Sequence, residues 1–223
     1  MQRFLIIVTV VALFAAGASA AVTTFTDRAA WEAAIGDSPD ILVDFDGVTV
    51  DTSFVGTPFD AGPFSLVGSS DVYDFIDAAP FEGVEGEWAI DGTTYALSEV
   101  SLADADEFEM TFDTLVTAWG ADFSKVDFGG LDLVLTSDVG TTTVSVPTIP
   151  ATGFFGFVTS PPESISSITF VARSEGEAFG MDNVALFPGT PIPTVSEWGL
   201  AVMTLLVLTA GTLVFARRRM AST

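Results

Sequence analysis

The sequence predicts an all-β domain, an antiparallel β-sandwich of jelly-roll-like type, with one short N-terminal helix and a targeting segment at each end. Between residues 41 and 187, short apolar or alternating runs recur between Gly, Pro, Asp and Ser, which is typical of strands joined by turns. Phe108, Met110 and Phe112 alternate with polar residues, as in a strand with one buried face. The 20 Phe residues can fill a core between two sheets. A closed barrel has the same periodicity and is the alternative.

The first twenty residues have the three parts of a secretory signal peptide. A basic start, Met1–Arg3, precedes an apolar core, Phe4–Phe14, that is too short to span a bilayer. The small residues Ala18–Ala20 suit a signal peptidase, so we expect cleavage before Ala21. Retention of this segment as an N-terminal membrane anchor is the alternative.

The stretch TFTDRAAWEAAIG, residues 24–36, predicts the helix. Thr26 is the expected N-cap, Asp27 lies in the first turn where an acid suits the helix dipole, and Gly36 ends the helix. Alanines favour the helical conformation between these ends. The apolar residues expected to anchor the helix on the domain are Phe25, Trp31 and Ile35.

Twelve runs predict strands after this helix. They are residues 41–45, 64–68, 72–76, 87–90, 99–103, 108–112, 118–123, 131–136, 142–146, 154–158, 167–172 and 183–187. The runs 131–136 and 142–146 predict a hairpin that turns at Ser137–Gly140. The acidic segment Asp104–Glu109 lacks the spacing of an EF-hand loop and predicts a solvated turn. The sandwich is therefore expected to occupy residues 21–188.

A second targeting segment follows the domain. A linker, residues 189–198, contains Pro and Gly that interrupt regular structure, and residues 199–216 then form an uncharged apolar run about 27 Å long as a helix. This length is just enough to cross a bilayer. The basic tail 217–223 begins with Arg217, Arg218 and Arg219, which are expected to stay in the cytoplasm, so residues 21–198 lie on the far side of the membrane.

The linker strip IPTVSEWG, together with the apolar run and the arginines, resembles the IPTL-CTERM sorting signal, a relative of the PEP-CTERM signals of Gram-negative bacteria. The resemblance implies recognition by an exosortase-type enzyme of the inner membrane and transfer of a membrane-anchored precursor to the cell surface or extracellular matrix. Val195 replaces the Leu that names the motif. An ordinary single-span anchor is the alternative. The positions that carry the resemblance are Ile192, Pro193, Thr194, Val195, Ser196, Glu197, Trp198 and Gly199.

The domain itself resembles the uncharacterised β-sandwich ectodomains that often carry such tails. The segments FTDRAAWEAAIG, DFDG, WGADFS and the run FFGFV to DNVAL carry this resemblance over most of residues 21–187. It implies a surface or matrix protein and gives no reaction.

The exported part is strongly acidic. It holds three basic residues, Arg28, Lys125 and Arg173, against all 30 acidic residues of the chain, a net charge of −27. Such a field excludes nucleic acid and anionic lipid as partners and favours cations, Ca²⁺ among them. Adaptation of the protein surface to salty surroundings explains the acidic charge equally well. There is no Cys and no His, so disulfides and thiol or imidazole chemistry are excluded.

Two acidic motifs near the ends of the domain suggest a Ca²⁺ site. Alternation places Asp44 and Asp46 of DFDG on one face of a strand, and GMDNV supplies Asp182 and Asn183 near the last strand. We expect the first and last strands of such a sandwich to be neighbours, which would bring these oxygen ligands together. Alternatively, the same residues cap strand ends and form Asx turns.

Saccharide binding is the alternative to a structural or adhesive role. Tyr73, Trp88 and Tyr95 lie in a loop-rich stretch and could form an aromatic platform for an extracellular polysaccharide, although packing in the core or at its rim is the commoner role of such residues. We do not expect an enzyme, because the chain lacks His, Cys and a nucleophile-elbow Ser, and its Trp residues are scattered. The sequence thus predicts an exported structural or adhesive protein, with a Ca²⁺-stabilised carbohydrate-binding module as the alternative.

Overall fold

A computed structural model describes residues 21–189, except 37, 71–72, 79–87 and 161–162. The chain divides into two compact units, residues 1–189 and 190–223, and every described residue belongs to the first. The predicted signal peptide, sorting strip, membrane helix and basic tail lie outside the described residues. Within the described part, no helix is long and apolar enough to cross a membrane.

The predicted helix is present as α2 (Arg28–Ile35), with its N-cap one residue later than expected. Asp27, rather than Thr26, is the N-cap, because its extended backbone lets Oδ1 accept a hydrogen bond from the Ala30 N–H at 2.8 Å. Gly36, at φ +80°, ends the helix in the left-handed conformation that glycine adopts readily. Trp31 anchors the helix as predicted: it is fully buried, and its Nε1–H donates to the Phe157 carbonyl at 3.0 Å.

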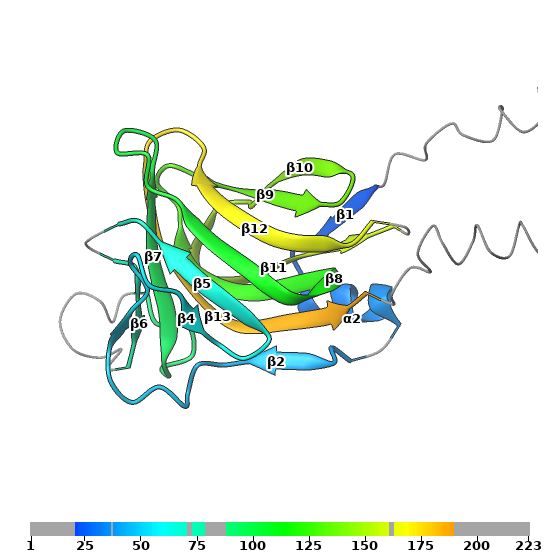
Figure 1. The fold of residues 1–223 in the computed structure, drawn as a ribbon, viewed down its shortest axis with the longest axis horizontal. Coiled ribbons are helices and arrows are strands. Elements are labelled where there is room, and N and C mark those ends of the chain that lie inside the picture. The colour runs from blue at the N-terminus through cyan, green and yellow to red at the C-terminus, as the bar shows by residue number, and fades with distance from the viewer. Residues whose placement is uncertain (1–20, 37, 71–72, 79–87, 161–162, 190–223) are drawn as a thin grey trace, which may run out of the picture. The chain divides into compact units, whose positions relative to one another are not determined.

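All other regular elements of the described residues are strands (Figure 1). They are β1 (Val22–Phe25), β2 (Ile41–Val43), β3 (Thr52–Ser53), β4 (Phe59–Asp60), β5 (Phe64–Gly68), β6 (Phe75–Asp77), β7 (Tyr95–Ser101), β8 (Phe108–Val126), β9 (Leu131–Ser137), β10 (Gly140–Ser145), β11 (Ile149–Thr159), β12 (Ile165–Ala172) and β13 (Gly176–Pro188). Every pairing between these strands is antiparallel, so the predicted all-β antiparallel class is confirmed.

The strands form one hydrogen-bonded sheet that folds into two layers through the long strand β8. The first part of β8 pairs with β5 and β12, and β12 continues to β9 and β10. The second part of β8 pairs with β11 and β13; β11 continues to β1, and β13 continues to β7 and β6. β2 pairs with the last part of β13. In Figure 1, β5 and β12 lie over the layer that contains β11 and β13.

The core between the layers is rich in aromatic residues. Phe170 on β12 stacks on Phe179 of β13, with ring centroids 5.9 Å apart, and so joins the two layers. Phe170 also contacts Phe108 at 4.6 Å and meets Trp119 edge-on at 6.0 Å. All four side chains are fully buried. β8 supplies both Phe108, from its first part, and Trp119, from its second part. The two parts of β8, which belong to different layers, therefore contribute to the same aromatic cluster.

Several predicted elements differ from the observed ones. Residues 108–112 and 118–123 belong to one strand rather than two, and the predicted strand 87–90 is wrong for its described part, because residues 88–90 form bends. The Trp88 carbonyl there accepts a hydrogen bond from the Ser124 hydroxyl instead of pairing with a strand. β1, β3 and β4 were not predicted. The hairpin turn at Ser137–Gly140 is confirmed. The turn predicted for Asp104–Glu109 is observed only at its start, because Asp106 bridges to Ser101 and β8 begins at Phe108.

Candidate functional site

The strand pairing brings the four predicted Ca²⁺ ligands to one junction. β2 and β13 are neighbours, and Val43 pairs with Val184. Asp44 directly follows Val43, and Asn183 directly precedes Val184, so the two motifs lie at the same end of the paired segment. The first predicted strand, β2, thus pairs with the last strand, although the first strand of the structure, β1, pairs with β11. The prediction that Asp44 and Asp46 share one face of a strand is wrong, because β2 ends at Val43 and both residues lie in the turn that follows it. Metal binding by these residues stays a prediction.

Asp182 is the most unusual residue of this junction. Its side chain is fully buried; Oδ1 accepts a hydrogen bond from the Asn183 N–H at 2.6 Å, and Oδ2 has no hydrogen-bond partner. Burial, with a smaller contribution from the negative charges of Asp91, Asp46 and Asp44, raises the pKa of Asp182 to about 8, although the hydrogen bond from the Asn183 N–H acts in the opposite direction. A buried carboxylate surrounded by like charges destabilises the folded state unless a cation or a proton neutralises its charge.

Asp91 also belongs to the junction, and the sequence analysis did not identify it. Its Oδ2 lies 3.5 Å from the Asn183 Nδ2, and its Oδ1 accepts a hydrogen bond from the Thr93 N–H at 3.1 Å. Hydrogen bonding from the Thr93 hydroxyl is the main cause that lowers the pKa of Asp91. Asp91 is 92 positions from Asn183, and only an Asp-Gly turn signal marks it in the sequence.

Part of the junction already has protein partners. Asp44 Oδ1 accepts a hydrogen bond from the Asp46 N–H at 3.2 Å, which is the Asx turn that the sequence offered as an alternative. Arg28 of α2 donates to the Asn183 carbonyl at 2.9 Å and forms an ion pair with Asp122 at 3.1 Å. Among the described residues, no three acidic side chains gather closely enough to hold a metal ion by carboxylates alone.

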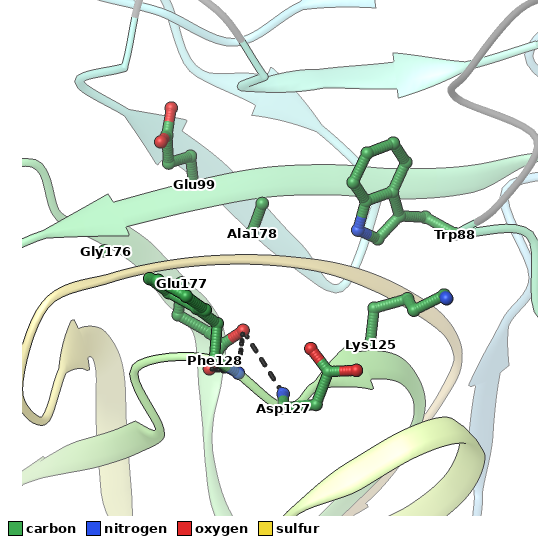
Figure 2. A pocket seen from close by; sticks show the side chains of 8 residues that line it. All are labelled: Trp88, Glu99, Lys125, Asp127, Phe128, Gly176, Glu177 and Ala178. Carbon is green, nitrogen blue, oxygen red and sulfur yellow. Dashed lines mark hydrogen bonds between the residues drawn. The ribbon is translucent and has the colours of Figure 1, made fainter.

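A separate cavity of about 410 Å³ opens beside the start of β13 (Figure 2). Its lining combines two aromatic side chains with carboxylates and one ammonium group: Trp88, Glu99, Lys125, Asp127, Phe128, Gly176, Glu177 and Ala178. Phe128 is 76% exposed, so most of its ring is available to a ligand. In Figure 2, Trp88 and Glu99 lie on either side of Ala178, and Lys125 and Asp127 lie together below Trp88.

The structure separates the three residues of the predicted aromatic platform. Trp88 lines the cavity. The Tyr73 ring contacts the Trp88 ring, with ring centroids 5.7 Å apart, and both side chains are half-buried. Tyr95 is fully buried, and its hydroxyl donates to Asp77 Oδ2 at 2.9 Å, so the prediction that it presents a face to a sugar is wrong. Phe128 was missed because it stands alone in a turn, DFGG, without an apolar pattern.

A buried carboxylate fixes the turn that carries Phe128. Glu177 is 2% exposed, and its two oxygens accept hydrogen bonds from the N–H groups of the four consecutive residues 127–130, at 2.7 to 3.3 Å. The turn lies so close to β13 that a Cβ on Gly129 would come within 2.6 Å of the Gly176 carbonyl oxygen. The rim of the cavity is therefore attached rigidly to β13.

Comparison with solved structures shows distant likenesses. The chain is similar to the family 11 carbohydrate-binding module of cellulase Lic26A-Cel5E of Clostridium thermocellum, with 14% identity, a TM-score of 0.36, and coverage of 68% of this chain and 95% of that one. It is also similar to the CBM22-1–GH10 modules of xylanase 10B of the same organism, with 13% identity, a TM-score of 0.39, and coverage of 68% of this chain and 29% of that one. A third similar structure is an F5/8 type C domain of Bacteroides fragilis, with 17% identity, a TM-score of 0.33, and coverage of 60% of this chain and 96% of that one. The sandwich assignment rests on the strand pairing and core described above.

Comparison with curated protein sequences gives no match. Comparison with protein families gives one, to the IPTL-CTERM motif at residues 190–219. The matched range contains the strip Ile192–Gly199, the apolar run and the three arginines, as predicted. This chain therefore carries an IPTL-CTERM motif, which follows an antiparallel β-sandwich domain.

Proposed function

We propose that this protein is exported through the inner membrane of a Gram-negative bacterium and handed by an exosortase-type enzyme to the cell surface or extracellular matrix. The IPTL-CTERM match at residues 190–219 is the observation that carries the proposal. The apolar run holds the precursor in the membrane, Arg217–Arg219 stop its transfer, and the strip Ile192–Gly199 is the substrate of the enzyme. At its destination the domain has a structural or adhesive role rather than a catalytic one.

Processing at the tail can be tested by intact mass spectrometry of the protein recovered from the cell surface. We expect a species that lacks residues 200–223, because cleavage near the motif removes the membrane helix. Pro193→Ala should cause the uncut precursor to accumulate, since proline helps to keep the strip extended for a protease-like site. Val195→Leu, which restores the name-giving residue of the motif, is the matched control and should be cut normally. A surface form of the wild-type chain that retains residues 200–223 would contradict the proposal.

A second candidate function is saccharide binding at the cavity beside β13. Trp88 and the exposed Phe128 offer apolar faces, while Glu99, Asp127 and Lys125 offer hydrogen-bond acceptors and a donor. This combination of aromatic faces with a few polar groups is what a small-ligand site needs, and sugars have both an apolar face and hydroxyl groups. Bound polysaccharide would make the domain an adhesive module of the matrix.

Binding can be measured by affinity electrophoresis through gels that contain individual extracellular polysaccharides. For a polysaccharide that retards the full chain, Trp88→Ala and Phe128→Ala should each weaken binding about tenfold, the loss expected when a contact worth roughly 1.4 kcal/mol is removed. Phe128→Ala should leave the melting temperature unchanged because the ring is mostly exposed. Val139→Ala, an exposed apolar residue outside the cavity, is the control. Failure of every polysaccharide to retard the chain would remove this candidate.

A further inference from the structure

We propose that the junction of β2 and β13 is a Ca²⁺-binding site that fastens the first part of the domain to its last strand. The proposed ligands are the carboxylate oxygens of Asp182 and Asp91, the amide oxygen of Asn183 and backbone carbonyls of the neighbouring loops, while the charges of Asp44 and Asp46 add to the attraction for a cation. The site is separate from the cavity beside the start of β13, and none of these residues lines that cavity.

The unpartnered oxygen of Asp182 is the main argument for this site. Asp182 is fully buried, yet its Oδ2 receives no hydrogen bond, although buried polar atoms in folded proteins nearly always have a partner. The other acidic motif, Asp44–Asp46, and the Asp91 turn are close enough for their charges to act on this carboxyl group. An oxygen in this position fits a metal ligand, because a bound cation would supply the missing partner.

The local charge balance also favours a cation. Four acidic residues meet at the junction, and the nearby basic side chain, Arg28, forms its ion pair with Asp122 instead. Lys125 lines the separate cavity, and Arg173 pairs with Asp132. Thus none of the three basic residues in the described part of the chain forms a salt bridge with the junction acids. A divalent cation would compensate the charge that the protein leaves unpaired.

The chemistry of the ligand set selects Ca²⁺ among common divalent ions. Zn²⁺ prefers nitrogen and sulfur ligands, and the chain has no His or Cys to provide them. Because no three carboxylates converge in the described part of the chain, the coordination shell must include amide and carbonyl oxygens and a flexible arrangement. Ca²⁺ accepts six to eight such oxygens in irregular geometry, whereas Mg²⁺ requires a near-ideal octahedron and keeps its water.

Two residues of the junction have left-handed backbone conformations. Phe45, between Asp44 and Asp46, has φ +56°, and Asn183 has φ +51°. The register of β13 against β8 shifts between Asp182 and Ala185, so Asn183 departs from the regular ladder. These conformations are uncommon for residues other than glycine, and binding of an ion at the junction would offset their energetic cost.

The test is thermal unfolding of the full chain, purified in a mild detergent, in EDTA and in millimolar Ca²⁺ or Mg²⁺ at equal ionic strength. With Ca²⁺ at a hundredfold excess over Kd, the melting temperature of the wild type should rise by about 5–10 °C. Mg²⁺ should produce a much smaller rise. No difference between Ca²⁺ and EDTA, or equal rises with Ca²⁺ and Mg²⁺, would overturn the proposal, because diffuse screening of an acidic surface does not depend on the identity of the ion.

Asp182→Asn separates metal binding from a purely structural role. In EDTA the variant should melt at or above the temperature of the wild type, because a neutral amide needs neither a proton nor a cation to be buried at this position. In Ca²⁺ it should melt below the wild type, because it has lost a ligand. Asp91→Asn should also reduce the Ca²⁺-dependent rise, whereas the exposed Asp138→Asn, with the same change of charge, should keep it in full. A full Ca²⁺ response in Asp182→Asn would refute this assignment.

Discussion

Replacing Phe170 by alanine should lower the free energy of unfolding by about 3–5 kcal/mol, the usual cost of removing a buried aromatic ring. Phe170 touches Phe108, Trp119 and Phe179, so the cavity left behind would lie between the two layers. Domains are stable by only about 5–15 kcal/mol, and this loss would remove a large share of that stability. Urea unfolding followed by tryptophan fluorescence would measure it, since Trp119 reports directly on this contact.

Two control variants test whether the loss of stability comes from the buried volume of the Phe170 ring. Phe170→Leu retains much of the apolar volume and should lose clearly less stability than the alanine variant. Phe128→Ala removes an equal ring from an exposed position and should change the free energy of unfolding by less than about 0.5 kcal/mol. A loss below about 1 kcal/mol for Phe170→Ala would show that the aromatic cluster does not hold the layers together.

Glu177→Ala should have an effect of similar size for a different reason. It removes the acceptor of four consecutive backbone N–H groups, and buried donors left without a partner cost about 1–3 kcal/mol each where water cannot reach them. Because the turn lies beside the open cavity, water will replace some of these bonds, so we expect a total loss of about 3–4 kcal/mol. The midpoint of urea denaturation would report this loss.

Glu177→Gln keeps the shape of the side chain but replaces one acceptor oxygen by an NH₂ group that opposes the N–H donors, so it should lose at least about 1–2 kcal/mol. Glu175→Ala, at an exposed position two residues earlier, is the matched control and should be nearly neutral. Equal stability of the Glu175 and Glu177 variants would mean that the carboxylate does not organise the turn. Loss of saccharide binding in the Glu177 variants, with Phe128 still present, would show that the turn must be held in place.

The sequence predicted most strands because their burial alternates. Phe108, Met110 and Phe112 are buried as the pattern required, and Phe64–Gly68 coincides with β5. The continuity of β8 was not predictable, because residues 113–115 are exposed where the strand leaves one layer for the other. The alternation is interrupted there although strand pairing continues into the second layer, so a periodicity argument finds two strands where the backbone forms one.

The candidate sites were predictable only where the motif itself carried the signal. Asp182 and Asn183 were found because they lie at the start of the predicted strand 183–187, and the partnership of β2 with β13 followed from the expected topology. Asp91 comes to the junction from a loop far away in the sequence, so local pattern could not reveal it. Tyr95 was misplaced because β7 is buried on both faces, and the hydrogen bond to Asp77 makes its hydroxyl compatible with burial.

The position of β13 has a mechanical consequence. Its first residues, Gly176 to Ala178, line the cavity, and the chain leaves the described domain just after its last residue, Pro188, toward the IPTL-CTERM motif. A ligand held at the cavity and an attachment at the tail would therefore pull on opposite ends of one strand, roughly 40 Å apart. Force that enters through Phe128 would reach β13 through the Glu177 hydrogen bonds and would load the β13 ladders with β7 and β8 along the strand direction, in shear. An adhesive domain built in this way could transmit force without unfolding.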